Sequence, residues 1–407
     1  MSRRHALLST LCLGLVAVLG YAVAHLDRVA IGAGESGPEP ELPVVEVTLQ
    51  RGKLDELFAP TNGEDGKVSL AATFRDGDRP PSRARVSLRG FSAWHHRRAK
   101  PSLRIKPRTA DLATPEFVEL SRPEDPLALC NWLPDQLSAE LGLMHEHSAP
   151  VRLVLNGRQR GVYLRSLRPG DDLAAQGGRP RGTFFKGDSL GSRRHLDLWA
   201  VADSWRAIGD PNPRARRALD RLLAALRMPP SVESLAILAA TLDLEAMARA
   251  QAVAVLTASI HADRAHNHVL FFDPAKDRLE PLLWDANGFG IHAEPGLAVD
   301  VMRHPLAERL ACDPCFVHRR NEILWQLLHG AGRAERLIAT AEERMTQLAA
   351  TLRHDPEIAR LVLRRGVFEV DPIGYDEVPA ALDTFRTFVR QREARLRDHF
   401  ADAHARV

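Results

Sequence analysis

Short runs of alternating apolar and polar residues dominate the first part of the chain. Such a period of two predicts strands that bury one face. The predicted strands are 44–49, 68–74, 83–88, 103–106, 151–155, 161–164 and 182–186. Asn156-Gly157 between two of them is typical of a tight hairpin turn. One helix is expected at 127–141, where apolar residues recur with helical spacing around Pro134.

Helical spacing dominates the remainder of the chain. The predicted helices are 219–226, 243–260, 316–328, 333–352, 357–364 and 376–400. One β hairpin interrupts them, with strands at 269–272 and 279–283 on either side of a polar turn. We therefore expect an α+β fold with a β-rich N-terminal lobe at 44–188 and an α-rich C-terminal lobe at 189–407.

The N-terminus has the pattern of a targeting segment. Arg3 and Arg4 precede an uncharged run from Ala6 to Ala24, which ends in Ala-Val-Ala. This pattern is typical of a signal peptide, and the run is also long enough for a retained transmembrane anchor. We expect residues 1–24 to be one or the other and 25–43 to be a linker. Both alternatives predict an exported protein of the periplasm or cell envelope.

Composition narrows the function only slightly. A net charge of +3 over 407 residues gives no indication of nucleic-acid binding. Six of the 55 basic residues are lysines and the rest are arginines. Each lysine retained against that bias is a candidate for a role that needs a compact ammonium group.

Three polar side chains flank the predicted hairpin. Asp263 and Asn267 precede its first strand, and Asp285 follows its second. Because a hairpin brings its outer ends together, we expect the three to converge. An Asp base, a metal-binding Asn and a second metal-binding Asp occur in this order in protein kinases. Asn267 and Asp285 offer the hard oxygen ligands that Mg²⁺ prefers, and Asp263 is the candidate base.

Candidate phosphate-binding cations lie in the β-rich part. Arg89 begins and Lys100 ends a basic loop that contains Gly90. Backbone N–H groups and cations of such a loop can surround a phosphate. Lys106 follows on an alternating strand, and Lys186 closes a later one. The sequence does not decide which lysine contacts a phosphate donor, and each is equally compatible with a solvated surface position.

Two other hypotheses concern a zinc site and the chemistry of two cysteines. His261, His266 and His268 with Asp263 suggest a zinc hydrolase, but a strand beginning near Asn267 would send successive side chains to opposite faces. Cys312 and Cys315 are expected to form a local disulfide in an exported protein, with a zinc or redox role less favoured.

Several of these stretches together resemble the CotH kinase family of atypical kinases. The similar segments are RARVSLRGFSAWHHRRAKPSLRIK at 83–106, the helix and Asn-Gly, Gly-Val-Tyr hairpin at 129–163, Phe-Phe-Lys at 184–186 and the Asp…His-Asn and Trp-Asp-Ala-Asn motifs within 261–290. The resemblance implies a two-lobed, protein-kinase-like architecture. It also implies Mg²⁺-dependent transfer of phosphoryl from ATP to a Ser or Thr hydroxyl of a protein substrate.

The chain departs from the family pattern at five positions. They are Phe91, Ala93, Cys130, Leu167 and Asn287, of which the last two replace acids. The candidate base and first metal carboxylate are kept. The departures leave a second hypothesis open, that the chain is a catalytically silent binding or scaffold protein of the cell envelope.

Overall fold

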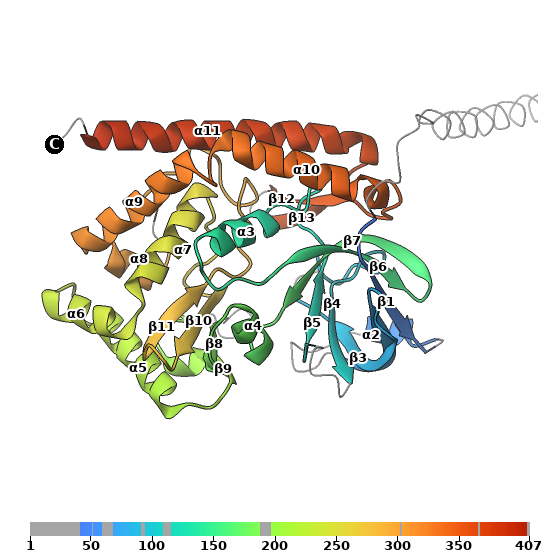
Figure 1. Cartoon of the computed structure of the whole chain (residues 1–407), viewed down its shortest axis with the longest axis horizontal. Helices are drawn as coiled ribbons and strands as arrows, with labels where there is room; N and C mark the ends of the chain where they lie inside the picture. The colour runs from blue at the N-terminus through green and yellow to red at the C-terminus, as the bar shows by residue number, and fades with distance from the viewer. Residues whose placement is uncertain are drawn as a thin grey trace, which may run out of the picture. The chain divides into compact units, whose positions relative to one another are not determined.

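A closed seven-stranded β barrel forms the first part of the computed structural model (Figure 1). Around the barrel the strands are β1 (Val44–Leu49), β2 (Leu70–Asp76), β3 (Ser82–Leu88), β4 (Leu103–Arg108), β5 (Val118–Ser121), β7 (Arg158–Leu167) and β6 (Ala149–Leu155). Neighbours are antiparallel except β1 and β6, which pair in parallel with Val45 opposite Leu153 and so close the barrel. Closure leaves the sheet without exposed edges.

The structure describes residues 41–50, 52–58, 68–90, 94–108, 115–187, 197–301, 303–364 and 367–404. The predicted targeting segment at 1–24 and most of the linker lie outside these residues. Among the helices described, none is long and apolar enough to cross a membrane.

Alternation along the strands fills the barrel. In β4, Leu103 and Ile105 are fully buried, whereas Arg104 and Lys106 between and after them face outward. Val47 and Leu153 contribute to the same interior cluster from β1 and β6. Because side chains alternate with a period of two, every second residue enters the core and its neighbours remain available for polar contacts.

A second sheet carries the predicted hairpin. Its order is β11 (Arg278–Leu282), β10 (His268–Asp273), β8 (Thr183–Gly187) and β9 (Trp205–Gly209). Every residue of β10 is buried. Leu270 and Phe272 pack into the large helical core, while Val269 and Phe271 pack on the other face with Phe184. This sheet is therefore covered on both sides, and β8 belongs to it rather than to the barrel.

Helices account for most of the second part, as Figure 1 shows with α11 running beside α10. The α-helices are α2 (Leu54–Leu57), α3 (Trp132–Glu140), α4 (Asp171–Gln176), α5 (Pro213–Arg227), α6 (Val232–Thr241), α7 (Leu244–Leu256), α8 (Pro305–Leu310), α9 (Pro314–His329), α10 (Ala334–Leu352) and α11 (Val378–His404). The α+β expectation is confirmed in this form, a β-rich first part with a barrel and a helical second part.

The prediction of a helix at 357–364 is wrong. The segment forms strand β12 (Ala359–Arg364), which pairs with β13 (Val367–Pro372). Val367–Val370 is itself rich in β-formers and supplies the partner strand. Local spacing over eight residues could not distinguish the two structures, since short apolar runs suit both.

The helix predicted at 127–141 begins later, at Trp132. The Asp125 carboxylate accepts the backbone N–H groups of Leu127, Leu129 and Cys130, and so fixes a turn before the helix. Pro134 then falls in the first helical turn, where a missing N–H is tolerated.

The prediction of a Cys312–Cys315 disulfide is also wrong, because both thiols are free. Cys312 donates its S–H back to Glu308 of α8, and Cys315 follows the N-cap of α9.

A buried ion pair joins the barrel to the turn after α10. Lys100 Nζ lies 2.5 Å from Asp355 Oδ2, and both side chains are at most 4% exposed. The same Asp355 oxygen accepts the Val162 N–H at 2.9 Å. Gly161 leaves room for this carboxylate, since a Cβ there would lie 2.0 Å from it.

Replacing Asp355 should therefore destabilise the fold. Asp355→Asn keeps an acceptor for Val162 but leaves the Lys100 ammonium buried without a counter-charge, a loss of about 3–5 kcal/mol in unfolding free energy. Glu116→Gln removes the carboxylate paired with exposed Lys106 and should change stability by less than about 1 kcal/mol. Urea unfolding of the two variants and the parent measures both. Equal stabilities would contradict a structural role for Asp355.

Candidate active site

Asp263 lies in the loop between α7 and β10, where three donors fix its carboxylate. Oδ1 accepts the N–H groups of Ala265 at 2.7 Å and His266 at 3.1 Å, and His266 Nδ1 lies 2.7 Å away. The Asp263 side chain is still 42% exposed. Burial opposes ionisation, but these hydrogen bonds outweigh it and lower the pKa of Asp263. The result is an anchored, ionised carboxylate with one side open to solvent.

The predicted metal residues Asn267 and Asp285 converge on His261. Its Nδ1 lies 3.0 Å from the Asn267 Nδ2 and 2.9 Å from the Asp285 carbonyl oxygen. Asp285 Oδ2 is 3.6 Å from the same nitrogen, and the Asn287 amide is 3.0 Å from it. The hairpin thus brings Asn267 and Asp285 together, as the sequence predicts, whereas the Asp263 carboxylate contacts Ala265 and His266 instead of His261.

The segment that carries Asp285 has an unusual backbone. Asp285, Asn287 and Phe289 have φ values of 51°, 44° and 56°. Left-handed conformations are uncommon for residues other than glycine and are held only by surrounding contacts. Here three left-handed residues alternate with other residues over five positions. Their side chains therefore point in directions that a regular strand or helix cannot provide.

Hydrogen bonds from other elements hold this segment. The Asp285 N–H donates to Glu146 Oε1 at 3.1 Å, and the Asn287 N–H donates to Asn131 Oδ1 at 2.8 Å. Asn131 Nδ2 returns a bond of 2.7 Å to Asn287 Oδ1. The Phe289 N–H donates to Thr257 just after α7. The Asp285 carboxylate is therefore positioned by residues from before β6, the start of α3 and the end of α7.

On the barrel, a buried glutamate pairs with two arginines. Glu119 accepts Arg89 Nε at 2.6 Å and Arg104 Nε at 2.8 Å. The carboxylate of Glu119 is 2% exposed, whereas the arginines retain 13% and 16%. Burial would raise the pKa of Glu119, but the charges of Arg89 and Arg104 lower it far below the usual value. Glu119 therefore orients two guanidinium groups from neighbouring strands.

Lys186 lies between these two groups of residues. It projects from β8 with its ammonium 5.0 Å from the centre of the Trp284 ring. Its charge contributes to lowering the pKa of Asp285, together with His261 and Arg89, against the raising effect of burial. It acts in the same direction on Glu119. The charge of Lys186 thus acts on both the barrel glutamate and the hairpin aspartate.

The other two candidate lysines have different surroundings. Lys100 is buried against Asp355, as described above, and burial lowers its pKa. Lys106 is half exposed and pairs with Glu116 at 3.0 Å, with its ammonium 4.8 Å from the Phe117 ring centre. Phosphate binding by either stays a prediction. Of the four predicted cations, Arg89 and Lys186 are the two whose charges act on Asp285.

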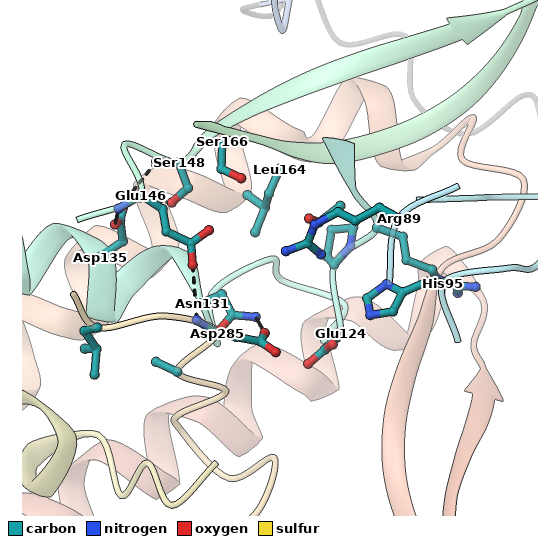
Figure 2. A pocket seen from close by; sticks show the side chains of 15 residues that line it. Arg89, His95, Glu124, Asn131, Asp135, Glu146, Ser148, Leu164, Ser166 and Asp285 are labelled. Atoms are coloured by element: carbon teal, nitrogen blue, oxygen red, sulfur yellow. Dashed lines mark hydrogen bonds between the residues drawn. The ribbon is translucent and has the colours of Figure 1, made fainter. Parts of the chain in front are cut away.

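A small cavity opens between the barrel and the Asp285 segment, with a volume of about 30 Å³. Figure 2 shows Arg89, Glu124, Asn131, Glu146 and Asp285 around it. Burial raises the pKa of Glu146 to about 8, with the charge of Asp135 adding to the effect and that of Arg89 opposing it. Two further acids, Glu124 and Asp135, also line the cavity. This acid-rich space adjoins Asp285, the carboxylate that the sequence predicts as a metal ligand.

Sequence reasoning did not identify five of these residues as functional: Arg104, Glu119, Glu124, Glu146 and His261 in its observed role. Glu119 had one local signal, a charge inside the apolar run Val118–Leu120. The sequence around Glu146, which lies between His145 and His147, contains no such local signal. Their placement depends on which loops the barrel closure brings toward the hairpin.

The three histidines of the zinc reading have separate partners. His266 contacts the Asp263 carboxylate, His268 Nε2 contacts the Asp263 carbonyl oxygen, and His261 contacts Asp285. Within the described residues, no group of three or more His, Cys, Asp or Glu side chains is arranged to hold a metal ion. The geometry therefore gives the zinc reading no support.

Removing the charge of Glu119 should weaken the fold at neutral pH. Glu119→Gln leaves two largely buried guanidinium groups without a counter-charge, a loss of about 3 kcal/mol. Because its pKa is lowered in the folded state, the carboxylate stabilises above the ordinary value of 4.5, and that stabilisation is lost as the pH falls below it. Denaturant unfolding from pH 7 to pH 3 should show the two proteins converging in acid. A constant difference would contradict the ion-pair explanation.

Comparison with known proteins supports the resemblance drawn from the sequence. A family model described as CotH kinase protein matches residues 86–396, more than half of the chain. The match covers the barrel from β3 onward, the second sheet and most of the helices. A search of curated proteins finds no match. Family membership implies possible kinase activity with ATP as the donor. The chain belongs to the CotH kinase family.

Proposed function

We propose that this protein is an exported, Mg²⁺-dependent kinase that transfers phosphoryl from ATP to a Ser or Thr hydroxyl of a protein. One observation carries the proposal. Arg89 and Asp285 line one small acid-rich cavity. Glu119 pairs with Arg89 and Arg104, the charge of Lys186 acts on both Glu119 and Asp285, and Asn267 contacts His261 beside Asp285. Phosphoryl transfer needs this combination of cation ligands, phosphate-binding cations and a hydroxyl-orienting group.

The donor atoms present fit a hard divalent cation. Asp285 offers a partly exposed carboxylate. Asn267 faces the same point, and a half-turn of its carboxamide presents either Nδ2 or Oδ1 there. Mg²⁺ keeps several waters and needs few protein ligands, so one carboxylate and one carboxamide suffice. When bound, the ion neutralises phosphate charge on the donor.

The nucleotide phosphates would contact the cations at the outer side of the cavity. The cavity of about 30 Å³ has room for an ion and a water. The side chains of Arg89 and Arg104 are 13% and 16% exposed, and Glu119 fixes their direction. Lys186 adds a compact charge from β8. These three side chains bind and orient the donor.

Asp263 would orient the acceptor hydroxyl. Its Oδ1 is occupied by the three donors described above, whereas its side chain remains 42% exposed. An ionised carboxylate with a lowered pKa is a weak base, so its contribution is to hold the hydroxyl in line and accept its proton late. His266 fixes the carboxylate through Nδ1.

Export rests on the N-terminal sequence alone. The pattern at residues 1–24 supports a protein of the periplasm or envelope, either released or anchored through residues 6–24. The alternative of a silent scaffold keeps the same location, and the kinase assay below separates the two.

Asp263→Asn and Asp285→Asn should each abolish most phosphoryl transfer. Loss of a positioned acid–base group lowers kcat about 10²–10⁴-fold, and loss of the ion ligand raises the Mg²⁺ requirement. Asp277→Asn, in the exposed turn of the same hairpin, is the matched control and should retain activity. The assay follows labelled γ-phosphate from ATP into protein at varied Mg²⁺. Equal background incorporation by parent and Asp263→Asn would favour the scaffold.

The lysines should differ in their effect on ATP. Lys186→Met should raise KM for ATP about tenfold or more, because a charge-assisted contact to phosphate is lost. Lys106→Met, which removes an exposed charge paired with Glu116, should change KM less than about twofold. Steady-state kinetics with ATP and protein acceptor measure both. A larger effect of Lys106→Met than of Lys186→Met would indicate that the phosphates bind at the outer face of β4.

A further inference from the structure

Glu124 is a buried carboxylate with one oxygen that no protein group satisfies. It lies between β5 and α3, is 7% exposed, and lines the cavity beside Asp285. Within the described residues, its Oε2 has no hydrogen-bond partner. Burying an unsatisfied carboxylate oxygen is costly, so such an atom calls for a partner that the protein alone does not supply.

The surroundings of Glu124 are unfavourable to a second negative charge. Figure 2 shows its carboxyl group and that of Asp285 directed toward the same space, with Arg89 above them. Both acids line the cavity, and the Glu124 side chain is almost completely buried there. Two carboxyl groups that face one cavity repel each other unless a proton or a cation lies between them.

We propose that Glu124 is a direct ligand of the divalent cation and binds it together with Asp285. The inference rests on the proposed function for the presence of a cation, and it adds a ligand from a different element. The cavity of about 30 Å³ is large enough for an ion with a water but for little more. A hard cation takes carboxylate oxygens in preference to other ligands and removes the repulsion between them.

This assignment explains how the site accommodates Asn287. Asn287 Oδ1 accepts from Asn131, and its Nδ2 faces His261, so its carboxamide serves the hydrogen bonds that hold the Asp285 segment. Glu124 then supplies the second negative charge from the barrel side of the cavity.

The experiment is Mn²⁺ binding to the full chain without nucleotide, followed by electron paramagnetic resonance of the free ion. Glu124→Gln should weaken binding about tenfold or more, as Asp285→Asn does. Glu146→Gln is the matched control, since its carboxyl group lines the same cavity but accepts the Asp285 N–H. It should weaken binding less than Glu124→Gln.

Thermal unfolding separates a ligand from a structural carboxyl group. Without metal, Glu124→Gln should melt at the parent temperature or above it, because the amide removes a buried repulsion. The rise in Tm that Mn²⁺ gives the parent should be lost in Glu124→Gln and reduced in Glu124→Asp, which keeps the charge on a shorter side chain. A lower Tm of the metal-free variant with an unchanged Mn²⁺ shift would overturn the proposal.

The two proposals fail in different ways. If the parent protein binds Mn²⁺ through Glu124 and Asp285 but transfers no phosphoryl group, the kinase proposal is wrong and the ligand assignment is supported. A Glu124→Gln protein that binds Mn²⁺ as tightly as the parent, while Asp285→Asn does not, would overturn the assignment and leave the kinase standing. Equal Mn²⁺ binding by Asp285→Asn and the parent would overturn the assignment as well.

Discussion

The hydrogen bonds that hold the backbone from Asp285 to Phe289 are the constraint on which the site depends. Each left-handed residue other than glycine costs on the order of 1 kcal/mol, so three in five residues would relax without support. Glu146 and Asn131 provide that support through the N–H groups of Asp285 and Asn287. Both supporting side chains come from the segment between β5 and β6. The direction of the Asp285 carboxylate is therefore set by how the barrel meets the second sheet.

A separate set of charges ties the barrel to the helical part. Asp355 and Glu357, just after α10, pair with Lys100 and with Arg97 and Arg122. Two cations of the basic loop, Arg97 and Lys100, are therefore engaged by an acidic turn more than 250 residues later. Such buried pairs specify one arrangement more than they add stability, because desolvation offsets most of the attraction. A loop anchored in this way holds Arg89, at its beginning, in place beside Glu119.

The sequence predicted the elements better than the contacts between them. Partial alternation identified six of the seven barrel strands, but β5 (Val118–Ser121) was not predicted. The hairpin at 269–283 was found because its two runs and polar turn are local signals. The convergence of Asn267 and Asp285 followed from hairpin geometry and is confirmed by their shared contact with His261. Glu146 and Glu124 could not be found in this way, since their roles arise from closure of the barrel. The prediction for Ala359–Arg364 was wrong for a similar reason, because the partner strand decides the conformation of this segment.

The charge balance of the cavity argues for a cationic occupant. Four carboxyl groups line it, those of Glu124, Asp135, Glu146 and Asp285, against the guanidinium groups of Arg89 and Arg122. Arg122 is already paired with Glu357, and Arg89 with Glu119. His95 contributes no charge near neutral pH, because burial and the charge of Arg89 lower its pKa to about 3. Burial makes an acid surplus unfavourable unless protons or a metal ion offset it. The pKa of Glu146, raised to about 8, means that a proton offsets part of this surplus in the metal-free protein, and the divalent cation of the proposed function would offset the rest.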